Sequence, residues 1–252
     1  MKWTLCGGGQ RAAYLAAELQ QHGHDVISLN PGGCAPVDWA RHVAWAECVV
    51  LPIPTRTVIW QPGDPGLSLV MRAVRPGSTV FGAFSGQIPG MYANSDINVI
   101  NILENPDFKH ANALPTAEGC IARMLPELGR TIEGSKILVT GNGEAGRAVC
   151  GKLQALNADV YLWSRRGGEE LAAGPYDAVI NTIPKQIFTG DILKALPVDC
   201  LMVELASAPY GFDVEQAGQL GLRTLVLPGL PGMFPKTAAK LTAETLLKEY
   251  QK

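Results

Sequence analysis

The 252-residue chain combines 47% hydrophobic with 17% charged residues and a formal net charge of -2, the balance of a globular protein large enough for two domains. That charge lacks the basic excess with which proteins bind nucleic acid, and no apolar run approaches the roughly 18 residues of a membrane span. We therefore expect a cytoplasmic protein that binds neither nucleic acid nor membrane, with six reduced, buried cysteines, since none forms a Cys-x-x-Cys pair.

The first stretch, from Lys2 to Asn30, predicts a strand, a glycine-rich turn, a helix and a second strand. The turn begins with Gly7 and Gly9, but the second strand runs into Asn-Pro-Gly-Gly, which offers neither an acid for NAD nor a base for NADP. We expect no dinucleotide here. Arg11, at the helix start, is either a cation that receives a substrate carboxylate or a surface arginine that binds nothing.

The next part of the chain predicts an α/β first domain with a parallel sheet. Its β-rich runs are residues 48–53, 78–84 and 97–103, with a helix over 67–74 between the first two. Ligands of such sheets gather beyond the carboxyl ends of the strands. The loops 54–56 and 85–87 are therefore candidate substrate loops, and Ser85 is a candidate hydrogen-bond donor.

Residues 104–115 are polar and bounded by prolines, which is typical of a connection between domains. Thr116 then predicts the N-cap of a new helix, with Glu118 in its first turn. The Glu118 carboxylate either stabilises that helix start or serves as a general base, should burial in a cleft raise its pKa.

The strongest functional signal lies between Ser135 and Cys150. A buried strand over residues 136–140 leads into Gly141, Gly143 and Gly146, the spacing of a dinucleotide-binding turn. The first glycine permits the tight turn, the second lets the backbone approach a pyrophosphate, and the third lets the helix pack on the strand. A helical pattern and a strand over 158–163 complete a β-α-β unit, for which an ordinary unit without nucleotide is the alternative.

The end of this second strand favours NADP over NAD. Ser164, Arg165 and Arg166 stand where an NAD enzyme usually has an acidic residue, and guanidinium groups can grip a 2′-phosphate bidentately. The alternative is a solvated arginine pair in a loop.

The remaining sequence predicts a doubly wound nucleotide domain and a final helix. Its strands are residues 176–183, 200–206 and 222–227, with helices opened by Thr189 and over 213–218. Residues 182–184 and Leu205 lie at strand ends, where the nicotinamide half of a cofactor would pass. The last helix begins at Pro235, and its apolar face is expected to dock on the first domain and bring Lys236 to a cleft. The alternative is that Lys236 is a solvated lysine at a helix start.

Together these patterns predict an α/β fold of two Rossmann-like, doubly wound parallel-sheet domains with a cleft between them. Residues 1–112 plus 235–252 are the expected substrate domain, of flavodoxin or Rossmann type and closed by the C-terminal helix, and residues 113–234 the expected NADP-binding domain. The candidate cofactor residues are Gly141, Asn142, Gly143, Glu144, Ala145, Gly146, Ser164, Arg165, Arg166, Thr182, Ile183, Pro184 and Leu205. No metal site is expected, because His110 has no partner at ligand spacing.

Five motifs resemble the A subunit of dipicolinate synthase. They are LPTAEG (Leu114 to Gly119), VTGNGEAGRA (Val139 to Ala148), INTIP (Ile180 to Pro184), ELASAPYGFD (Glu204 to Asp213) and LPGLPGMFPKTAAK (Leu227 to Lys240). The resemblance is strong from about Asn101 onward and weak before it. It implies the NADP-using component of an enzyme of spore-forming bacteria, which dehydrogenates a dihydrodipicolinate-pathway intermediate to dipicolinate and works with a flavoprotein-like B subunit.

The resemblance also implies a substrate with two carboxylates. Arg11 and Lys236 are the candidate carboxylate ligands, Ser85, Thr116 and Thr237 the candidate donors, and Lys236 and Glu118 the candidate catalytic residues. Two other functions remain open: an NADP-dependent dehydrogenase of another small acid, and a non-catalytic NADP-binding module that regulates a partner. A homo-oligomer also remains open.

Overall fold

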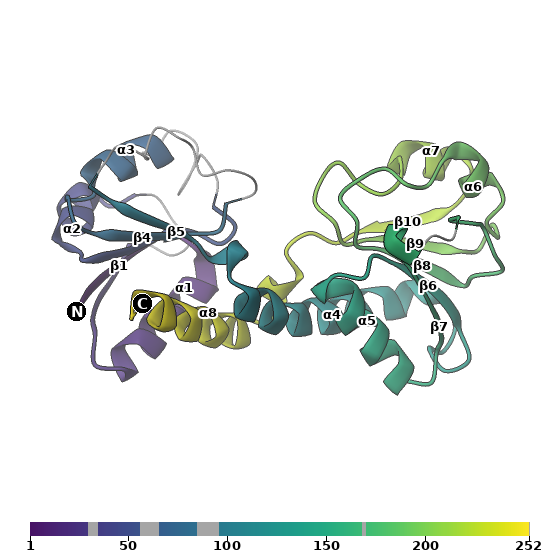
Figure 1. Ribbon diagram of the computed structural model, residues 1–252, viewed down its shortest axis with the longest axis horizontal. Coiled ribbons are helices and arrows are strands. Elements are labelled where there is room, and N and C mark those ends of the chain that lie inside the picture. The colour runs from purple at the N-terminus through teal and green to yellow at the C-terminus, as the bar shows by residue number, and fades with distance from the viewer. Residues whose placement is uncertain (30–34, 56–65, 85–95, 168–169, 252) are drawn as a thin grey trace. The chain divides into compact units, whose positions relative to one another are not determined.

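The computed structural model describes residues 1–29, 35–55, 66–84, 96–167 and 170–251 (Figure 1). The chain divides into two compact units, Met1–Asn112 with Phe234–Lys252, and Ala113–Met233. Each unit contains a five-stranded parallel sheet flanked by helices. The predicted α/β class, with two Rossmann-like parallel sheets, is confirmed.

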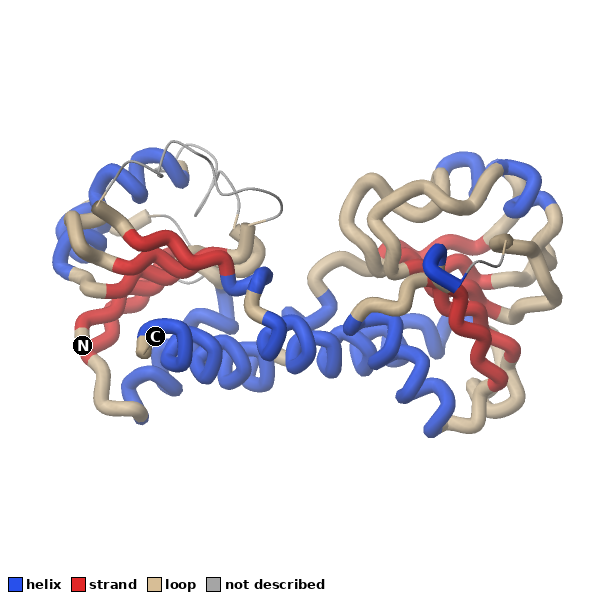
Figure 2. Tube along the Cα trace, in the orientation of Figure 1, coloured by secondary structure: helices blue, strands red, loops and turns tan. Residues whose placement is uncertain are grey.

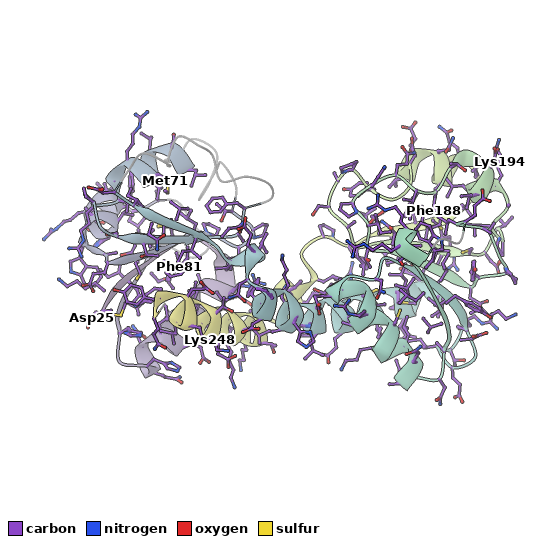
Figure 3. All side chains as sticks on the ribbon, viewed as in Figure 1. Asp25, Met71, Phe81, Phe188, Lys194 and Lys248 are labelled. Carbon is purple, nitrogen blue, oxygen red and sulfur yellow. The ribbon has the colours of Figure 1, made fainter. Side chains whose placement is uncertain are left out.

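The first unit has the strand order β2-β1-β3-β4-β5. Its strands are β1 (Lys2–Cys6), β2 (Asp25–Leu29), β3 (Cys48–Val50), β4 (Thr79–Gly82) and β5 (Asn98–Asn101), and its helices are α1 (Gly9–Gln21), α2 (Trp39–Trp45), α3 (Leu67–Ala73) and α8 (Pro235–Tyr250). Side chains of successive strand residues point to opposite faces, so the sheet builds two cores. Phe81 belongs to the core under α1 and α8, and Met71 to the core under α2 and α3 (Figure 3).

The final helix packs against α1, as the tube trace also shows (Figure 2). Its buried residues Ala239, Ala243 and Leu246 join the same core as Leu15 and Leu19 of α1. The last helix therefore packs within the first unit, against α1.

The short helix α2 was not predicted from the sequence. Val43 is its buried residue, and one buried position in seven residues gives no helical period of apolar side chains.

The second unit has the strand order β10-β9-β8-β6-β7. Its strands are β6 (Lys136–Thr140), β7 (Asp159–Trp163), β8 (Ala178–Asn181), β9 (Leu201–Glu204) and β10 (Arg223–Val226), and its helices α5 (Glu144–Ala155), α6 (Gly190–Lys194) and α7 (Val214–Gln219). Short 3-10 turns are η2 (Ile102–Glu104) in the first unit, and η3 (Arg165–Gly167) and η4 (Leu230–Met233) in the second. One core lies under α5 and the C-terminal part of α4 (Pro106–Leu128), and another lies under α6 and α7.

The predicted connection over residues 104–115 is wrong, because most of it belongs to the helix α4. The helix starts where Asn105 Oδ1 accepts a hydrogen bond of 2.8 Å from the Phe108 N–H, with Pro106 at the first helical position. Pro115 lacks a donor within the helix, but Phe108 and Ala113 are buried ahead of it, and their packing keeps this stretch helical. Thr116 is therefore not an N-cap, and Glu118 lies in mid-helix rather than in a first turn.

The two β-α-β units repeat in the same register. Lys2 pairs with Asp25 in the first and Lys136 with Asp159 in the second, so that the second starts 134 residues after the first, by 136 minus 2 and 159 minus 25. The repeat extends to the turns, since Gly7 N donates to Leu29 O and Gly141 N to Trp163 O. The two strand-turn-helix-strand segments therefore share one backbone pairing pattern, which includes the glycine turns.

Candidate dinucleotide-binding site

The glycine turn after β6 contains three glycines. Two of them are tightly surrounded by neighbouring atoms, and the third has free space beside it. Gly141 has a φ of 105°, and a side chain there would overlap the hydroxyl of Thr182. A side chain at Gly146 would overlap the Gly141 carbonyl oxygen, while at Gly143 nothing lies within 4 Å. The outer glycines therefore close the turn, and Gly143 leaves the space that a pyrophosphate needs.

The N-cap residue of α5 is a glycine, which has no side chain with which to cap the helix. Gly143 is its N-cap, in extended conformation and without a side-chain hydrogen bond. Since the first N–H groups of a helix have no partner within it, these donors and the positive end of the helix dipole suit an anion. Asn142 is exposed, and Glu144 and Ala145 of the first turn are half-buried.

Arg147 is a candidate that the sequence analysis missed. Its guanidinium pairs with the Glu144 carboxylate and donates a hydrogen bond of 2.8 Å to the Asn142 carbonyl oxygen. The pair neutralises the one acid in the first turn of α5, which would otherwise repel a phosphate. The sequence signal for this ion pair was the spacing of Glu144 and Arg147, which are opposite charges three residues apart at a helix start.

The segment that follows β7 lies beside the glycine turn, because β7 pairs with β6. It consists of Ser164, Arg165 and Arg166. Thr140 and Trp163 are paired across β6 and β7, and the Gly141 N–H donates to the Trp163 carbonyl at 2.8 Å. Arg165 and Arg166 are exposed in η3, whereas Ser164 is half-buried. The structure thus places both arginines next to the turn that has the open glycine.

The other predicted cofactor residues follow the neighbouring strands. Thr182 comes after β8, and its hydroxyl donates a hydrogen bond of 2.8 Å to the Thr140 carbonyl oxygen. Leu205 comes after β9, and its N–H donates to the Asn181 carbonyl at 2.9 Å. Ile183 is buried and Pro184 exposed. All predicted cofactor residues of this unit therefore lie at one end of its sheet, beyond the carboxyl ends of four strands.

A buried polar cluster lies beneath these loops and was not predicted either. Thr140, Asn181 and Glu204, the last residues of β6, β8 and β9, are each fully buried and hydrogen-bonded through Asn181. Each of these residues ends an apolar strand. The sequence signal for the cluster was therefore only a polar residue at a strand end, which does not predict burial or a hydrogen-bond partner.

In the first unit, Arg11 is half-buried in the first turn of α1, and its side chain has neither a hydrogen bond nor an ion pair with any residue that the structure describes. Burial lowers the pKa of its guanidinium. A cavity of about 20 Å³, large enough for about one water molecule, is lined by Arg11 together with Gly7, Gly8 and Pro52, among others. A half-buried, unpaired cation beside a helix start is suited to an anionic group.

Lys236 reaches the helix that carries Arg11. Its Nζ lies 5.6 Å from the ring centroid of Tyr14, one turn after Arg11 on α1, within the range of a cation–π interaction. Thr237 is exposed at the start of α8. The structure thus brings Lys236 to the helix α1, where its contact residue Tyr14 lies one turn from Arg11. Ser85, the rest of the loop 85–87, Arg56 and residues 30–33 lie outside the described residues.

Glu118 and Thr116 lie in the second unit, on α4. The Glu118 carboxylate is 2.9 Å from Lys152 Nζ of α5 and is about half exposed, while Thr116 is half-buried. An exposed pair of this kind contributes about 0–1 kcal/mol to stability.

Glu118→Gln tests the predicted role as a general base. We expect a small change in the free energy of unfolding, within about 1 kcal/mol, because the ion pair is exposed. Loss of a general base lowers kcat by about 100-fold or more. Lys152→Met removes the same ion pair and is the matched control, so equal kcat values for both variants would exclude Glu118 as the base.

Thiol and metal chemistry find no support in the described residues. Their five cysteines are buried and unpaired, and burial raises the pKa of Cys6, Cys48, Cys120 and Cys200 to about 12 and that of Cys150 to about 11. These thiols stay protonated near neutral pH. Within the described ranges, no three His, Cys, Asp or Glu side chains gather as metal ligands, and no helix has the length and apolarity to cross a bilayer.

Comparison with known proteins gives one relative by sequence. The A subunit of dipicolinate synthase from Bacillus subtilis is 30% identical over 185 residues, which cover 66% of this chain and 62% of the relative. The match thus spans less than two thirds of the length of this curated relative. No known family model matches the sequence.

Solved structures share the fold along nearly the whole chain. The A chain of dipicolinate synthase from Bacillus subtilis has a TM-score of 0.82 and 24% identity, covering 100% of this chain and 96% of that one. An NAD+-bound 3-phosphoglycerate dehydrogenase of Entamoeba histolytica has a TM-score of 0.59 and 13% identity, covering 98% and 94%. The resemblance predicted from the motifs is confirmed: this chain is related, in sequence and in fold, to the A subunit of dipicolinate synthase.

Proposed function

We propose that this protein is an NADP-dependent oxidoreductase, the A subunit of a dipicolinate synthase. It would dehydrogenate a dihydrodipicolinate-pathway intermediate to dipicolinate together with a second, B subunit. The relationship to the dipicolinate synthase of Bacillus subtilis supports the substrate class and the partner, and the two-unit fold shared with NAD-dependent dehydrogenases supports the reaction type.

The observation that carries the proposal is the empty space beside Gly143, where a side chain would meet no other residue. Gly141 and Gly146 are needed for packing, whereas a Cβ at Gly143 would meet nothing, so the protein itself does not account for this glycine. The uncapped start of α5 supplies N–H donors at the same place. Residues 141–147 would hold the pyrophosphate, and a bound nicotinamide would supply the hydride acceptor.

The choice of NADP rests on Ser164, Arg165 and Arg166. They follow the strand that pairs with β6, and both arginines are exposed, as ligands of a phosphate brought from solvent must be. An acidic residue, which would select NAD by binding the ribose hydroxyls, is replaced here by Ser164.

The dicarboxylate would be held in the first unit by Arg11 and Lys236. The Arg11 side chain lacks a hydrogen-bond or ion-pair partner among the described residues. Lys236 contacts the Tyr14 ring of the same helix, a contact that leaves the N–H donors of its ammonium group available. Thr237 adds a hydroxyl beside Lys236, and Ser85 and Thr116 remain proposed donors. Two separate cations suit a substrate with two carboxylates better than one with a single carboxylate.

A turnover assay with NADP tests the proposed function. Formation of NADPH with a dihydrodipicolinate precursor, alone or after addition of the B subunit, is the expected result. Turnover of a different small acid would make the protein another dehydrogenase. Tight NADP binding without turnover of any acid, with the B subunit present, would make it a binding module.

Lys236→Met tests the carboxylate site. We expect the apparent KM for the dicarboxylate to rise at least tenfold, because a charge-assisted hydrogen bond contributes about 1.5–3 kcal/mol, while NADP affinity stays unchanged. Lys240→Met, one turn later on α8 and also exposed, is the matched control. Equal KM values for the two variants would remove Lys236 from the site.

A further inference from the structure

Glu204 is a buried carboxylate at the end of β9, and the described residues that donate hydrogen bonds to it are uncharged. Its side chain has no exposed surface, and within the described part of the chain no Lys, Arg or His forms an ion pair with it. Four hydrogen bonds reach its two oxygens instead. A buried charge held only by neutral donors keeps most of its field, since no opposite charge cancels it.

The donors around Glu204 favour the ionised form, because they direct four hydrogen bonds at its two carboxylate oxygens. Asn181 Nδ2 lies 2.8 and 2.9 Å from the two carboxylate oxygens, and the N–H groups of Ala206 and Gly211 donate to one oxygen each at 2.7 Å. A protonated carboxyl would direct its own O–H at one of these donors. Burial raises the pKa of Glu204, and the hydrogen bonds from Gly211, Asn181 and Ala206 oppose that shift.

The same bonds tie Glu204 to the loops of the candidate cofactor site. Ala206 and Gly211 both belong to the loop of residues 205–213 between β9 and α7, so one carboxylate holds this loop at two points. Asn181 connects it to β6, because the Thr140 hydroxyl donates to Asn181 Oδ1 at 2.7 Å. Gly211 must be glycine, since a side chain there would overlap the Asn181 amide. The charge is therefore held rigidly at the carboxyl ends of the central strands.

We infer that Glu204 is an electrostatic positioning residue, whose buried negative charge makes the site bind the oxidised, cationic nicotinamide in preference to the reduced, neutral one. The inference rests on the proposed function, and on the expectation that the nicotinamide half passes residues 182–184 and Leu205, which follow β8 and β9. An anion in a region of low dielectric stabilises a nearby cation far more than a neutral ring. A dehydrogenase that takes up NADP+ and releases NADPH gains from this preference.

Glu204→Gln tests the inference through the Kd for NADPH divided by the Kd for NADP+. Both constants are measured by titration of the full-length protein. Gln removes the charge at nearly the same size. We expect the ratio to fall at least about threefold, through weaker NADP+ binding. A purely structural role would weaken both cofactors by the same factor, and an unchanged ratio would overturn the inference.

Thr140→Val is the matched control, since it removes a hydrogen bond of the same buried cluster but leaves the charge. Its ratio should equal that of the unaltered protein even where both affinities drop. If Glu204→Gln does not fold, as judged by thermal unfolding, Glu204→Asp takes its place. It keeps the charge, so its ratio should stay within about twofold, and a larger change would contradict the electrostatic role. Failure of the unaltered protein to bind either cofactor would refute the proposed function instead.

Discussion

Gly143→Val should abolish dinucleotide binding while the protein stays folded. The φ of Gly143 is -86°, which valine adopts readily, and no atom lies within 4 Å of the new Cβ, so the fold has room for it. The branched side chain would then fill the space proposed for the pyrophosphate. We expect NADP affinity to fall by about 100-fold or more, about 2.7 kcal/mol, in a titration of both proteins.

Gly151→Val provides the control on the same helix. Gly151 is exposed on α5, and a side chain there also meets nothing within 4 Å, yet it lies two turns beyond the glycine turn. Its NADP affinity should be unchanged. Gly146→Ala should act differently again, by lowering the unfolding temperature, because its Cβ would overlap the Gly141 carbonyl. Normal binding by folded Gly143→Val would place the pyrophosphate elsewhere.

Arg165→Ala combined with Arg166→Ala should remove the preference for NADP. Each charge-assisted hydrogen bond lost to the 2′-phosphate costs about 1.5–3 kcal/mol, so NADP affinity should fall at least tenfold. NAD has no 2′-phosphate, and its affinity should be nearly unchanged. Because both arginines are exposed in η3, the stability of the fold should not change measurably.

Arg123→Ala, an exposed arginine on α4, controls for the loss of positive charge from this unit. It should leave both affinities as they are. The binding measurements belong at one fixed ionic strength, since salt screens exposed charges. Equal affinities of the unaltered protein for NADP and NAD would end the assignment of these arginines to a 2′-phosphate.

The sheets and the glycine turn could be predicted because their signals are local. The apolar run before Gly141 and the spacing of Gly143 and Gly146 reflect constraints that act within a few residues. The repeat added a second instance, with Gly7 and Gly9 in the same pattern. The adjacency of Arg165 to the turn followed as well, because consecutive strands of a β-α-β unit pair.

The errors and omissions concern residues whose role depends on distant partners. The helix α4 passes through Pro115 because side chains on both sides of it are buried, which propensity does not reveal. Glu118 was placed near a helix start for the same reason. Glu204 lay inside the predicted strand 200–206 without a signal of its own, since its donors Asn181, Ala206 and Gly211 come near it only in the folded protein.

The docking of α8 on α1 has a consequence for how the chain folds during synthesis. The second unit is continuous in sequence, Ala113–Met233, and can close its core as it leaves the ribosome. The first unit cannot, because Leu15 and Leu19 share their core with Ala243 and Leu246, which are made more than 200 residues later. Until then an apolar face of α1 stays uncovered, so the part of the protein made first is the part completed last, and it depends longest on protection from aggregation.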